Sequence, residues 1–357
     1  MYFHFIMTGG SHMALEHSRF TENELIAFVG AHYGLEITAV RKLPLGSANC
    51  FCLSDGAQRY FLKEFQSGIE CDAVTAEASL IAALAVRGIP VARFLPAKDG
   101  AWVTEYRGGT VCLQEYIEGT AYGYDDFPSR LMPVLAATLG KLHTAMRDMT
   151  LPAHRDANWA ASYRGAESAA QYDALLAAAE RMREDAEYPR IAAELRYKKE
   201  LAYRCEDYAR FYEGITYCPT HGDFQGCQTV WEGEHLRAVI DFSAAKRLPA
   251  VWEVMRSFVQ SSSYSRATAR IDLDAMREYV REYLKYAPLT ERDLRAMPYV
   301  YLFQLAKSKF GYPQYLQTDS PDRMGLLQFA HWRTQMCREV ESRAEEISEA
   351  MASLLYE

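Results

Sequence analysis

The sequence predicts an α+β fold in two lobes: a small β-rich N-terminal lobe with one main helix, and a larger, mostly helical C-terminal lobe. Short apolar runs bounded by turn residues fill the first part of the chain, whereas helical apolar spacing dominates the rest. Strands and helices do not alternate in the first part, as they would in a doubly wound sheet. We place the lobes at residues 19–117 and 118–357. Residues 1–18 are interpreted as a tag or disordered tail, because Gly10-Ser11-His12-Met13 resembles an expression-vector remnant.

The N-terminal lobe begins with a helix whose start is marked by a capping box. Thr21 and Glu24 have the Ser/Thr-x-x-Glu spacing, and Gly34 stands where a helix would stop, so a helix is predicted over 22–33. The pair Asp55-Gly56 predicts a β-hairpin. The elements predicted after the first helix are strands 37–43, 49–54 and 58–65, a helix over 71–87, and strands 91–95, 101–106 and 110–116.

The C-terminal lobe is predicted to be helical except for one short hairpin over 229–241. That hairpin turns at Glu232-Gly233-Glu234. Apolar spacing and a high content of Ala, Leu, Glu and Arg predict the remaining elements as helices. They are 129–149, 164–183, 186–213, 250–262, 272–286, 291–309 and 322–355.

Composition narrows the class of protein. Apolar residues make up 49% and charged residues 24%, as in a globular protein with a large core. The net charge of −8 argues against a nucleic-acid-binding surface, which is usually basic. No apolar run approaches the roughly 18 residues that a membrane span needs. The eight cysteines lack zinc-ligand spacing, so we expect reduced thiols in a cytoplasmic protein. From the net charge and the lack of a long apolar run, we expect neither a nucleic-acid partner nor a membrane partner. The oligomeric state is not predicted.

The most informative segment is His221-Gly222-Asp223-Phe224-Gln225-Gly226-Cys227-Gln228, followed by a strand that ends in Ile240-Asp241-Phe242. A kinase catalytic loop needs an aspartate that orients the attacking hydroxyl and an amide oxygen for Mg²⁺. It also needs a second aspartate at a strand end that holds the metal against the ATP phosphates. Asp223, Gln228 and Asp241 have this arrangement, with glutamine in the position where asparagine is usual.

These motifs resemble those of the aminoglycoside phosphotransferase and choline kinase-like family of small-molecule kinases, which have a protein-kinase-like fold. The resemblance covers about residues 21–260. It implies ATP as the phosphoryl donor, with GTP as an alternative, together with Mg²⁺ and a small-molecule hydroxyl acceptor. Such an acceptor would be an aminoglycoside-like antibiotic, an amino alcohol or a homoserine-like compound. Asp223 would then be catalytic, and Gln228 and Asp241 would be the metal ligands.

A lysine in the N-terminal lobe is the candidate phosphate-binding residue. Lys63 lies in a predicted strand, and a lysine there can pair with the α- and β-phosphates when a helix glutamate holds it. Glu77, in the middle of the predicted helix over 71–87, is the expected partner. Glu64 and Glu70 are weaker candidates, because Glu64 alternates onto the opposite strand face and Glu70 precedes the helix.

The resemblance also implies how the rest of the nucleotide is bound. In the loop before the strand of Lys63, backbone amides near Gly46 and the hydroxyl of Ser47 would cradle the phosphates. The segment over 111–119 would be the hinge between the lobes. There the carbonyl of Glu115 and the N–H of Ile117 would bind the adenine ring.

Residues after Asp241 leave two interpretations open. Trp252, Glu253 and Arg256 either line the acceptor pocket or anchor their helix to the core, with Glu253 and Arg256 paired at i, i+3. A group of tyrosines is predicted to serve in packing rather than as a ligand cage: Tyr299, Tyr301, Tyr312 and Tyr315.

The segment between Asp241 and Pro249 is too short for the activation segment of a protein kinase, which favours a small acceptor. The alternative function is a nucleotide-binding pseudokinase or regulatory module, and it is suggested by Gln228.

Overall fold

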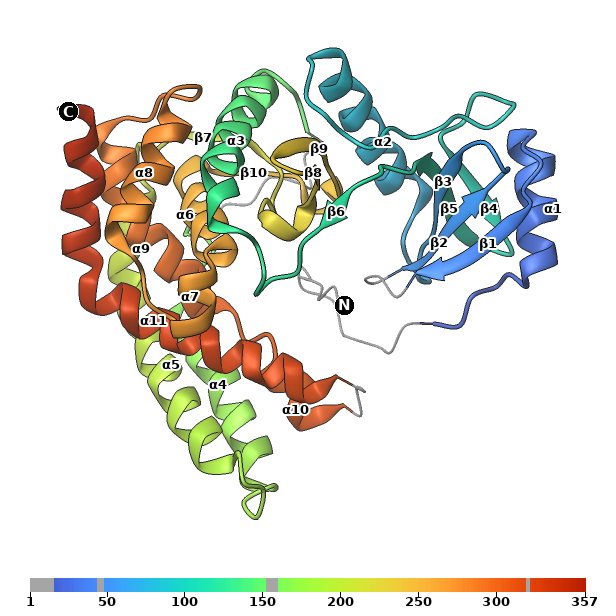
Figure 1. The fold of residues 1–357 in the computed structure, drawn as a ribbon. Coiled ribbons are helices and arrows are strands. Elements are labelled where there is room, and N and C mark those ends of the chain that lie inside the picture. Colours follow the sequence, from blue (N-terminus) through green and yellow to red (C-terminus); the bar gives the residue numbers. More distant parts are fainter. Residues whose placement is uncertain (1–15, 44–47, 152–159, 319–321) are drawn as a thin grey trace. The chain divides into compact units, whose positions relative to one another are not determined.

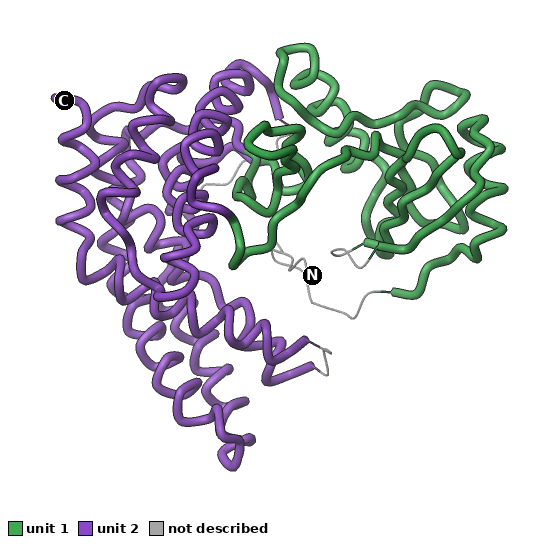
Figure 2. Tube along the Cα trace, in the orientation of Figure 1, with its two compact units in different colours: residues 1–127, 221–245 green, residues 128–220, 246–357 purple. Residues whose placement is uncertain are grey.

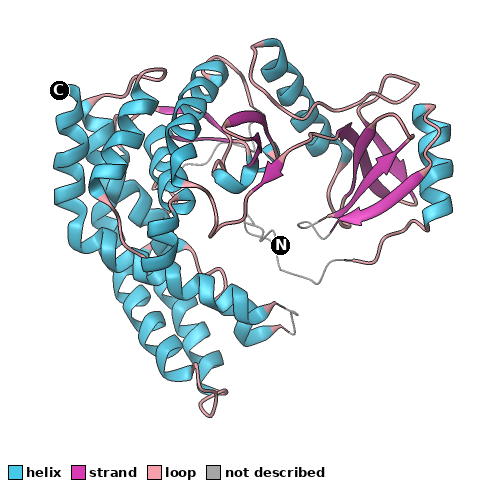
Figure 3. Ribbon diagram, viewed as in Figure 1, coloured by secondary structure: helices cyan, strands magenta, loops and turns pink. Residues whose placement is uncertain are grey.

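The computed structural model describes residues 16–43, 48–151, 160–318 and 322–357. The backbone packs as two compact units, shown in green and purple in Figure 2. The first contains residues 1–127 and 221–245, and the second contains residues 128–220 and 246–357. The lobes predicted at 19–117 and 118–357 stay a prediction. Most strands belong to the first unit, whereas the second unit is largely helical (Figure 3).

A five-stranded antiparallel sheet forms the first half of the first unit (Figure 1). Its order is β1-β2-β3-β5-β4. Lys63 is paired with Cys50 on one side and with Cys112 on the other, so its strand is central. The strands are β1 (Ala39–Leu43), β2 (Asn49–Ser54), β3 (Arg59–Glu64), β4 (Val103–Tyr106) and β5 (Gly109–Glu115).

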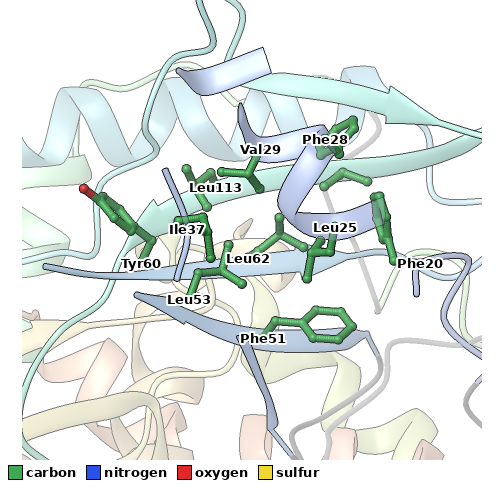
Figure 4. Packing of buried hydrophobic residues seen from close by; sticks show 11 residues of the cluster. Phe20, Leu25, Phe28, Val29, Ile37, Phe51, Leu53, Tyr60, Leu62 and Leu113 are labelled. Atoms are coloured by element: carbon green, nitrogen blue, oxygen red, sulfur yellow. The ribbon is translucent and has the colours of Figure 1, made fainter. Parts of the chain in front are cut away.

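Helix α1 (Glu22–Tyr33) covers one face of this sheet (Figure 4). The predicted capping box forms: Thr21 accepts from the backbone N–H of Glu24, and the Glu24 carboxylate accepts from the Thr21 N–H. The helix ends at Gly34, whose φ of +74° is the left-handed conformation that glycine adopts readily. The core beneath the helix contains Phe20, Leu25, Phe28, Val29, Ile37, Phe51, Leu53, Tyr60, Leu62, Val111 and Leu113.

The alternation of β3 sends Lys63 to the face opposite to this core. Tyr60 and Leu62 point into the core under α1, and side chains of a strand alternate between its two faces. Helix α2 (Cys71–Val86) packs against β4 in the same unit and carries Glu77, which is 4% exposed. The charged pair predicted for phosphate binding is therefore kept apart from the apolar core.

The prediction of a strand over 91–95 is wrong. Val91 and Phe94 form only isolated bridges, Val91 parallel to Val239 and Phe94 antiparallel to Gln114. A segment that pairs with two different partners in two directions cannot extend one ladder. The bridge at Val239 joins this segment to a small sheet of order β6-β8-β9, made of β6 (Thr120–Ala121), β8 (Thr229–Glu232) and β9 (His235–Val239).

Helices make up most of the second unit. They are α3 (Met132–Met146), α4 (Gly165–Glu180), α5 (Tyr188–Tyr208), α6 (Ala250–Ser261), α7 (Ser263–Thr268), α8 (Leu273–Leu284), α9 (Glu291–Lys307), α10 (Tyr312–Gln317) and α11 (Arg323–Ala352). Single 3₁₀ turns in the two units are η1 (Ser129–Leu131), η3 (Ala209–Tyr212), η4 (Gly226–Gln228), η5 (Phe242–Ala244) and η6 (Ser353–Leu355). Within the described ranges, no helix combines the length and the apolar character needed to cross a bilayer.

The expectation that only one hairpin interrupts the helices of the C-terminal part is wrong. A second, two-stranded antiparallel ladder joins β7 (Tyr217–Thr220) and β10 (Lys246–Pro249). These strands directly precede and follow the segment that carries the candidate catalytic residues. Each has four residues and contains a proline, which weakens the local signal for a strand.

The second unit buries a lysine that has no carboxylate partner among the residues of the described ranges. Lys198 of α5 is 1% exposed, and its Nζ donates to the carbonyls of Leu305 (2.9 Å) and Ser308 (2.6 Å) at the end of α9. Burial lowers its pKa to about 8. Because the unfolded lysine titrates near 10.4, the unfolded chain binds more protons than the folded chain between about pH 8 and pH 10.

We therefore expect the stability of the wild type relative to Lys198→Met to rise with pH over this window, by on the order of 3 kcal/mol in total. Urea unfolding of both proteins at pH 7.5 and pH 9.5 measures the difference. The control is Lys199→Met, because Lys199 is paired with Asp173 at 2.8 Å and its pKa is raised. A difference between wild type and Lys198→Met that stays flat with pH would contradict the assigned titration.

Candidate active site

The centre of the candidate site is an ion pair between residues far apart in the sequence. Lys63 lies on β3, and Asp241 follows β9. The Lys63 Nζ is 3.6 Å from Asp241 Oδ1, and the side chains are 15% and 21% exposed. Asp241 has a φ of +62°, a left-handed conformation that aspartate tolerates better than most residues. The first unit thus brings together the predicted phosphate-binding lysine and the predicted metal ligand.

Electrostatics keep both members of this pair charged. Burial alone would lower the pKa of Lys63, but the carboxylates of Asp241 and Glu77 more than offset this effect, so the pKa is raised. Burial would raise the pKa of Asp241. The charge of Lys63 and a hydrogen bond from the Ser243 hydroxyl (2.8 Å) outweigh this effect of burial, so the pKa of Asp241 is lowered. The site therefore presents one fixed cation and two acidic groups at neutral pH.

Glu77, and neither of its two rivals, lies near Lys63. Its charge contributes to the pKa of Lys63. Glu64 is fully buried and accepts instead from the backbone N–H of Arg19 (2.8 Å) and the hydroxyl of Ser18 (2.7 Å). Glu70 is exposed and precedes α2. The expected partner of Lys63 is thus the glutamate of the helix.

A buried histidine ties the loop of Asp223 to the strand that leads to Asp241. The backbone N–H of Asp223 lies 3.3 Å from His221 Nδ1, which can accept it only as an unprotonated nitrogen. The His221 Nε2 is then the protonated nitrogen, and it donates to the carbonyl of Ile240 (2.9 Å). The N–H of Ile240 in turn donates to the carbonyl of Gln228 (3.0 Å). His221 therefore braces the loop through one tautomer.

Two glutamine amides lie against the carboxylate of Asp223. Gln228 Nε2 donates to Oδ2 at 2.9 Å, and Gln225 Nε2 lies 3.4 Å from Oδ1. Gln225 is also 3.3 Å from the hydroxyl of Tyr124. Sequence reasoning missed Gln225 and Tyr124. Gln225 is two residues from Asp223 and could have been considered, whereas nothing in the sequence connects Tyr124 to this loop.

The orientation of Gln228 bears on its predicted role as a metal ligand. Its amide nitrogen is directed to Asp223, so its carbonyl oxygen is the atom left for a cation. The carboxylate of Asp241 and the amide oxygen of Gln228 are both hard oxygen donors, the kind that Mg²⁺ prefers. Within the described part of the chain, no group of three or more His, Cys, Asp or Glu residues forms a metal site by itself.

The other predicted nucleotide-binding residues are placed only in part. Gly46 and Ser47 lie outside the described residues. Glu115 ends β5, and its side chain is paired with Arg93, whose Nε donates at 2.9 Å. Ile117 follows the strand and is half-buried.

The structure favours the anchoring interpretation for Glu253. This residue of α6 is fully buried, and its carboxylate is 2.8 Å from His143 Nε2 on α3. The other nitrogen of His143 is 2.8 Å from the hydroxyl of Tyr283 on α8. Glu253 therefore joins three helices of the second unit. The predicted packing tyrosines Tyr301, Tyr312 and Tyr315 are buried, and Tyr299 stacks on Phe211.

A lysine–aspartate pair beside a braced aspartate loop is the arrangement expected of a phosphotransferase enzyme. The sequence profile of the phosphotransferase enzyme family, APH, matches residues 39–289, and the chain belongs to this family. This result confirms the resemblance drawn from the motifs, and with it the class of enzyme, a small-molecule kinase. No curated protein matches the chain.

Solved structures with the same fold include three small-molecule kinases. Spectinomycin phosphotransferase, in complex with ADP and spectinomycin, is 14% identical with a TM-score of 0.64, over 95% of this chain and 99% of that chain. The microcompartment-associated aminopropanol kinase is 16% identical with a TM-score of 0.64, over 92% and 99%. Amicoumacin kinase, in complex with AMP-PNP and Ca²⁺, is 14% identical with a TM-score of 0.61, over 89% and 94%. The likeness confirms the predicted protein-kinase-like fold.

Proposed function

We propose that the protein transfers the γ-phosphoryl group of ATP to a hydroxyl of a small molecule in a Mg²⁺-dependent reaction. GTP is the alternative donor. The observation that supports this most is the 3.6 Å pair of Lys63 and Asp241, in the same compact unit as the loop of Asp223. Phosphoryl transfer depends mainly on positioning and on electrostatic stabilisation of the phosphates. Lys63 supplies a fixed cation for the phosphates, and Glu77 and Asp241 keep it charged. Asp223 supplies an oriented carboxylate for the acceptor.

Lys63 binds the α- and β-phosphates in this proposal. Glu77 and Asp241 keep the ammonium charged and in place. Gly46 and Ser47 cradle the phosphates, and the adenine ring is bound by the backbone at residues 115–117, through the carbonyl of Glu115 and the N–H of Ile117.

The metal-binding residues are Asp241 and Gln228, whose oxygen donors suit Mg²⁺. When bound, the ion neutralises charge on the transferred phosphoryl group. Lys63 keeps the Asp241 carboxylate ionised and therefore able to act as a ligand.

Asp223 orients the acceptor hydroxyl and accepts its proton late in the transfer. Its two oxygens have different surroundings, since Gln228 donates to Oδ2 at 2.9 Å and Gln225 lies at the longer distance of 3.4 Å from Oδ1. The strong bond to Gln228 fixes the carboxylate plane.

The acceptor is a small hydroxylated molecule, with aminoglycoside-like antibiotics, amino alcohols and homoserine-like compounds as the candidates. The stretch from Asp241 to Pro249 consists of a single 3₁₀ turn and the strand β10, which leaves no segment for docking a protein substrate. We expect the enzyme to act in the cytoplasm, without nucleic-acid or membrane partners.

Purified protein with ATP and Mg²⁺ tests this function against a panel of spectinomycin, 1-aminopropan-2-ol, choline and L-homoserine. Formation of a phosphorylated acceptor is followed by ³¹P NMR, and ADP release is compared with the rate without acceptor. We expect acceptor-dependent ADP release with one class of compound. Intact ATP binding without phosphorylation of any hydroxylated acceptor would favour the pseudokinase alternative.

Substitutions of Gln228 test its proposed role as a metal ligand separately from its hydrogen bond to Asp223. Gln228→Leu removes the amide, so we expect the Mg²⁺ concentration for half-maximal activity to rise at least about tenfold. Gln228→Asn keeps an amide oxygen on a shorter stem and should retain most of the metal affinity. Steady-state rates over a Mg²⁺ titration measure both. A lower turnover with unchanged Mg²⁺ dependence in Gln228→Leu would limit Gln228 to its contact with Asp223.

A further inference from the structure

Two half-buried lysines lie at the C-terminal end of α9 without a counter-ion. Lys307 is the last residue of the helix, and Lys309 follows it by two residues. Lys63, Lys199 and Lys285 each pair with a carboxylate. In the portion of the chain that the structure describes, neither Lys307 nor Lys309 forms such a pair. The two ammonium groups therefore lack the interaction that most strongly favours the charged form of a lysine.

Lys309 is held in place by a backbone carbonyl and an aromatic ring. Its Nζ donates to the carbonyl of Lys307 at 3.1 Å and lies 5.0 Å from the centre of the Tyr172 ring. The Nζ of Lys307 lies beside two other rings, 5.8 Å from the centre of Tyr163 and 5.6 Å from that of Phe303. An aromatic ring attracts an ammonium group only modestly. These contacts position the two side chains but do not replace a carboxylate.

Titratable groups on the neighbouring helices do not supply a counter-ion either. Lys198 of α5 is another cation. Burial lowers its pKa, and the charges of Arg333 of α11 and of Lys309 add to this effect. The hydroxyl of Tyr172 of α4 donates to the backbone at the end of α9. The carboxylate of Glu206 of α5 accepts from a backbone N–H at the start of α4 at 2.6 Å.

This environment makes the side chain of Lys309 a better nucleophile at neutral pH than that of an ordinary lysine. Burial lowers the pKa of Lys309 to about 8, and the charge of Lys307 adds to this effect. At pH 7.5 about a quarter of the Lys309 side chain is then neutral amine, compared with about 0.1% of an unperturbed lysine. The neutral amine is the form that attacks an electrophile. Lys309 is half-buried, unlike the fully buried Lys198, so a small reagent can reach it.

We infer that Lys309 is an acylation site whose acyl donor is an acyl phosphate. The unpaired ammonium of Lys307, together with Lys198, favours a donor that carries negative charge. Lysine side chains are common targets of acylation, which converts the ammonium into a neutral amide.

The acylation needs no oxidant, no reductant and no other residue. The nitrogen of Lys309 attacks the acyl carbon and forms a C–N bond. The bond between that carbon and the phosphate oxygen breaks, and inorganic phosphate leaves with its electron pair. The proton released from the nitrogen passes to water. The inference does not depend on the proposed kinase activity.

Reaction of the full chain with acetyl phosphate tests the site. Peptide mass spectrometry follows the acetylation of each lysine over time at pH 7.5. Lys141 is the matched reference, because its Nζ also lies over a ring, 4.8 Å from the centre of Tyr286, but the residue is exposed. We expect Lys309 to react at least about fivefold faster than Lys141. Reaction of Lys309 at or below the rate of Lys141 overturns the inference.

The pH profile of the wild type gives a second readout that no folding defect of a variant can affect. The rate at Lys309 should level off above about pH 9, because its amine is then almost entirely neutral. A rate that keeps rising to pH 10, as expected of an unperturbed lysine, contradicts the assigned environment.

One variant and one further reagent test the role of the surrounding charge. Lys307→Met removes the neighbouring cation and should slow acetylation of Lys309 about two- to fivefold at pH 7.5. Lys42→Met removes an exposed lysine of the first unit and should change nothing. N-acetoxysuccinimide is a neutral acyl donor, so its preference for Lys309 over Lys141 should be at least about twofold smaller than that of acetyl phosphate. Equal preferences with the two reagents overturn the assignment of an anionic donor.

Discussion

Replacing Asp223 with asparagine should lower kcat by about 10² to 10⁴ while leaving the affinity for ATP nearly unchanged. Asparagine has almost the same shape, so the loop held by His221 should keep its conformation. The amide cannot accept the proton of the acceptor hydroxyl. It also places an NH₂ group opposite one of the two glutamine amides that now face the carboxylate, which misorients the side chain.

Steady-state kinetics with the preferred acceptor, together with calorimetric titration of ATP, separate the two effects. The control is Asp72→Asn, which changes an exposed carboxylate of α2 in the same unit and should leave both quantities unchanged. Wild-type turnover by Asp223→Asn would remove Asp223 from the chemistry. A loss of ATP affinity as large as the loss of kcat would place it in nucleotide binding instead.

Elements with local signals were predictable from the sequence. The capping box of Thr21 fixed the start of α1, and Asp55-Gly56 marked the turn between β2 and β3. The ladder of β7 and β10, in contrast, depends on pairing between segments on either side of the catalytic residues. The prediction of a strand over 91–95 was wrong for a related reason, because the two bridges of this segment lead to different strands. Contacts between distant segments leave no periodicity to read.

The difference between local signals and contacts between distant segments also applies to the candidate site. Asp223, Gln228 and Asp241 were found because phosphoryl transfer requires them at a fixed spacing along the chain. The approach of Asp241 to Lys63 joins segments far apart in the chain, so no spacing along the sequence predicts it.

The amide of Gln225 was missed for a different reason. The motif specifies no residue type between Asp223 and Gln228, so it predicted no role for the side chain of Gln225. Its burial, at 1% exposure, and its proximity to Asp223 are properties of the folded loop alone.

The close approach of two backbone segments at Gly222 predicts the largest loss of stability. Gly222 has a φ of +80°, and a Cβ added to it would lie 1.9 Å from the carbonyl oxygen of Ala244. The neighbouring atom belongs to the backbone of η5, immediately after Asp241, so it cannot rotate away. Gly222→Ala should therefore cost about 2 to 5 kcal/mol, from the left-handed conformation and the steric overlap together.

Gly233→Ala is the matched control for this substitution. Gly233 also has a positive φ, +61°, in the turn between β8 and β9, but a Cβ added there would meet no atom within 4 Å beyond its chain neighbours. It should lose only the backbone contribution, about 1 kcal/mol. Urea unfolding compares the two variants, and equal costs would refute the close contact with Ala244. Because relief of the overlap must move either the loop of Asp223 or the turn after Asp241, Gly222→Ala should also lose activity under conditions in which it remains folded. Gly233→Ala should keep its activity.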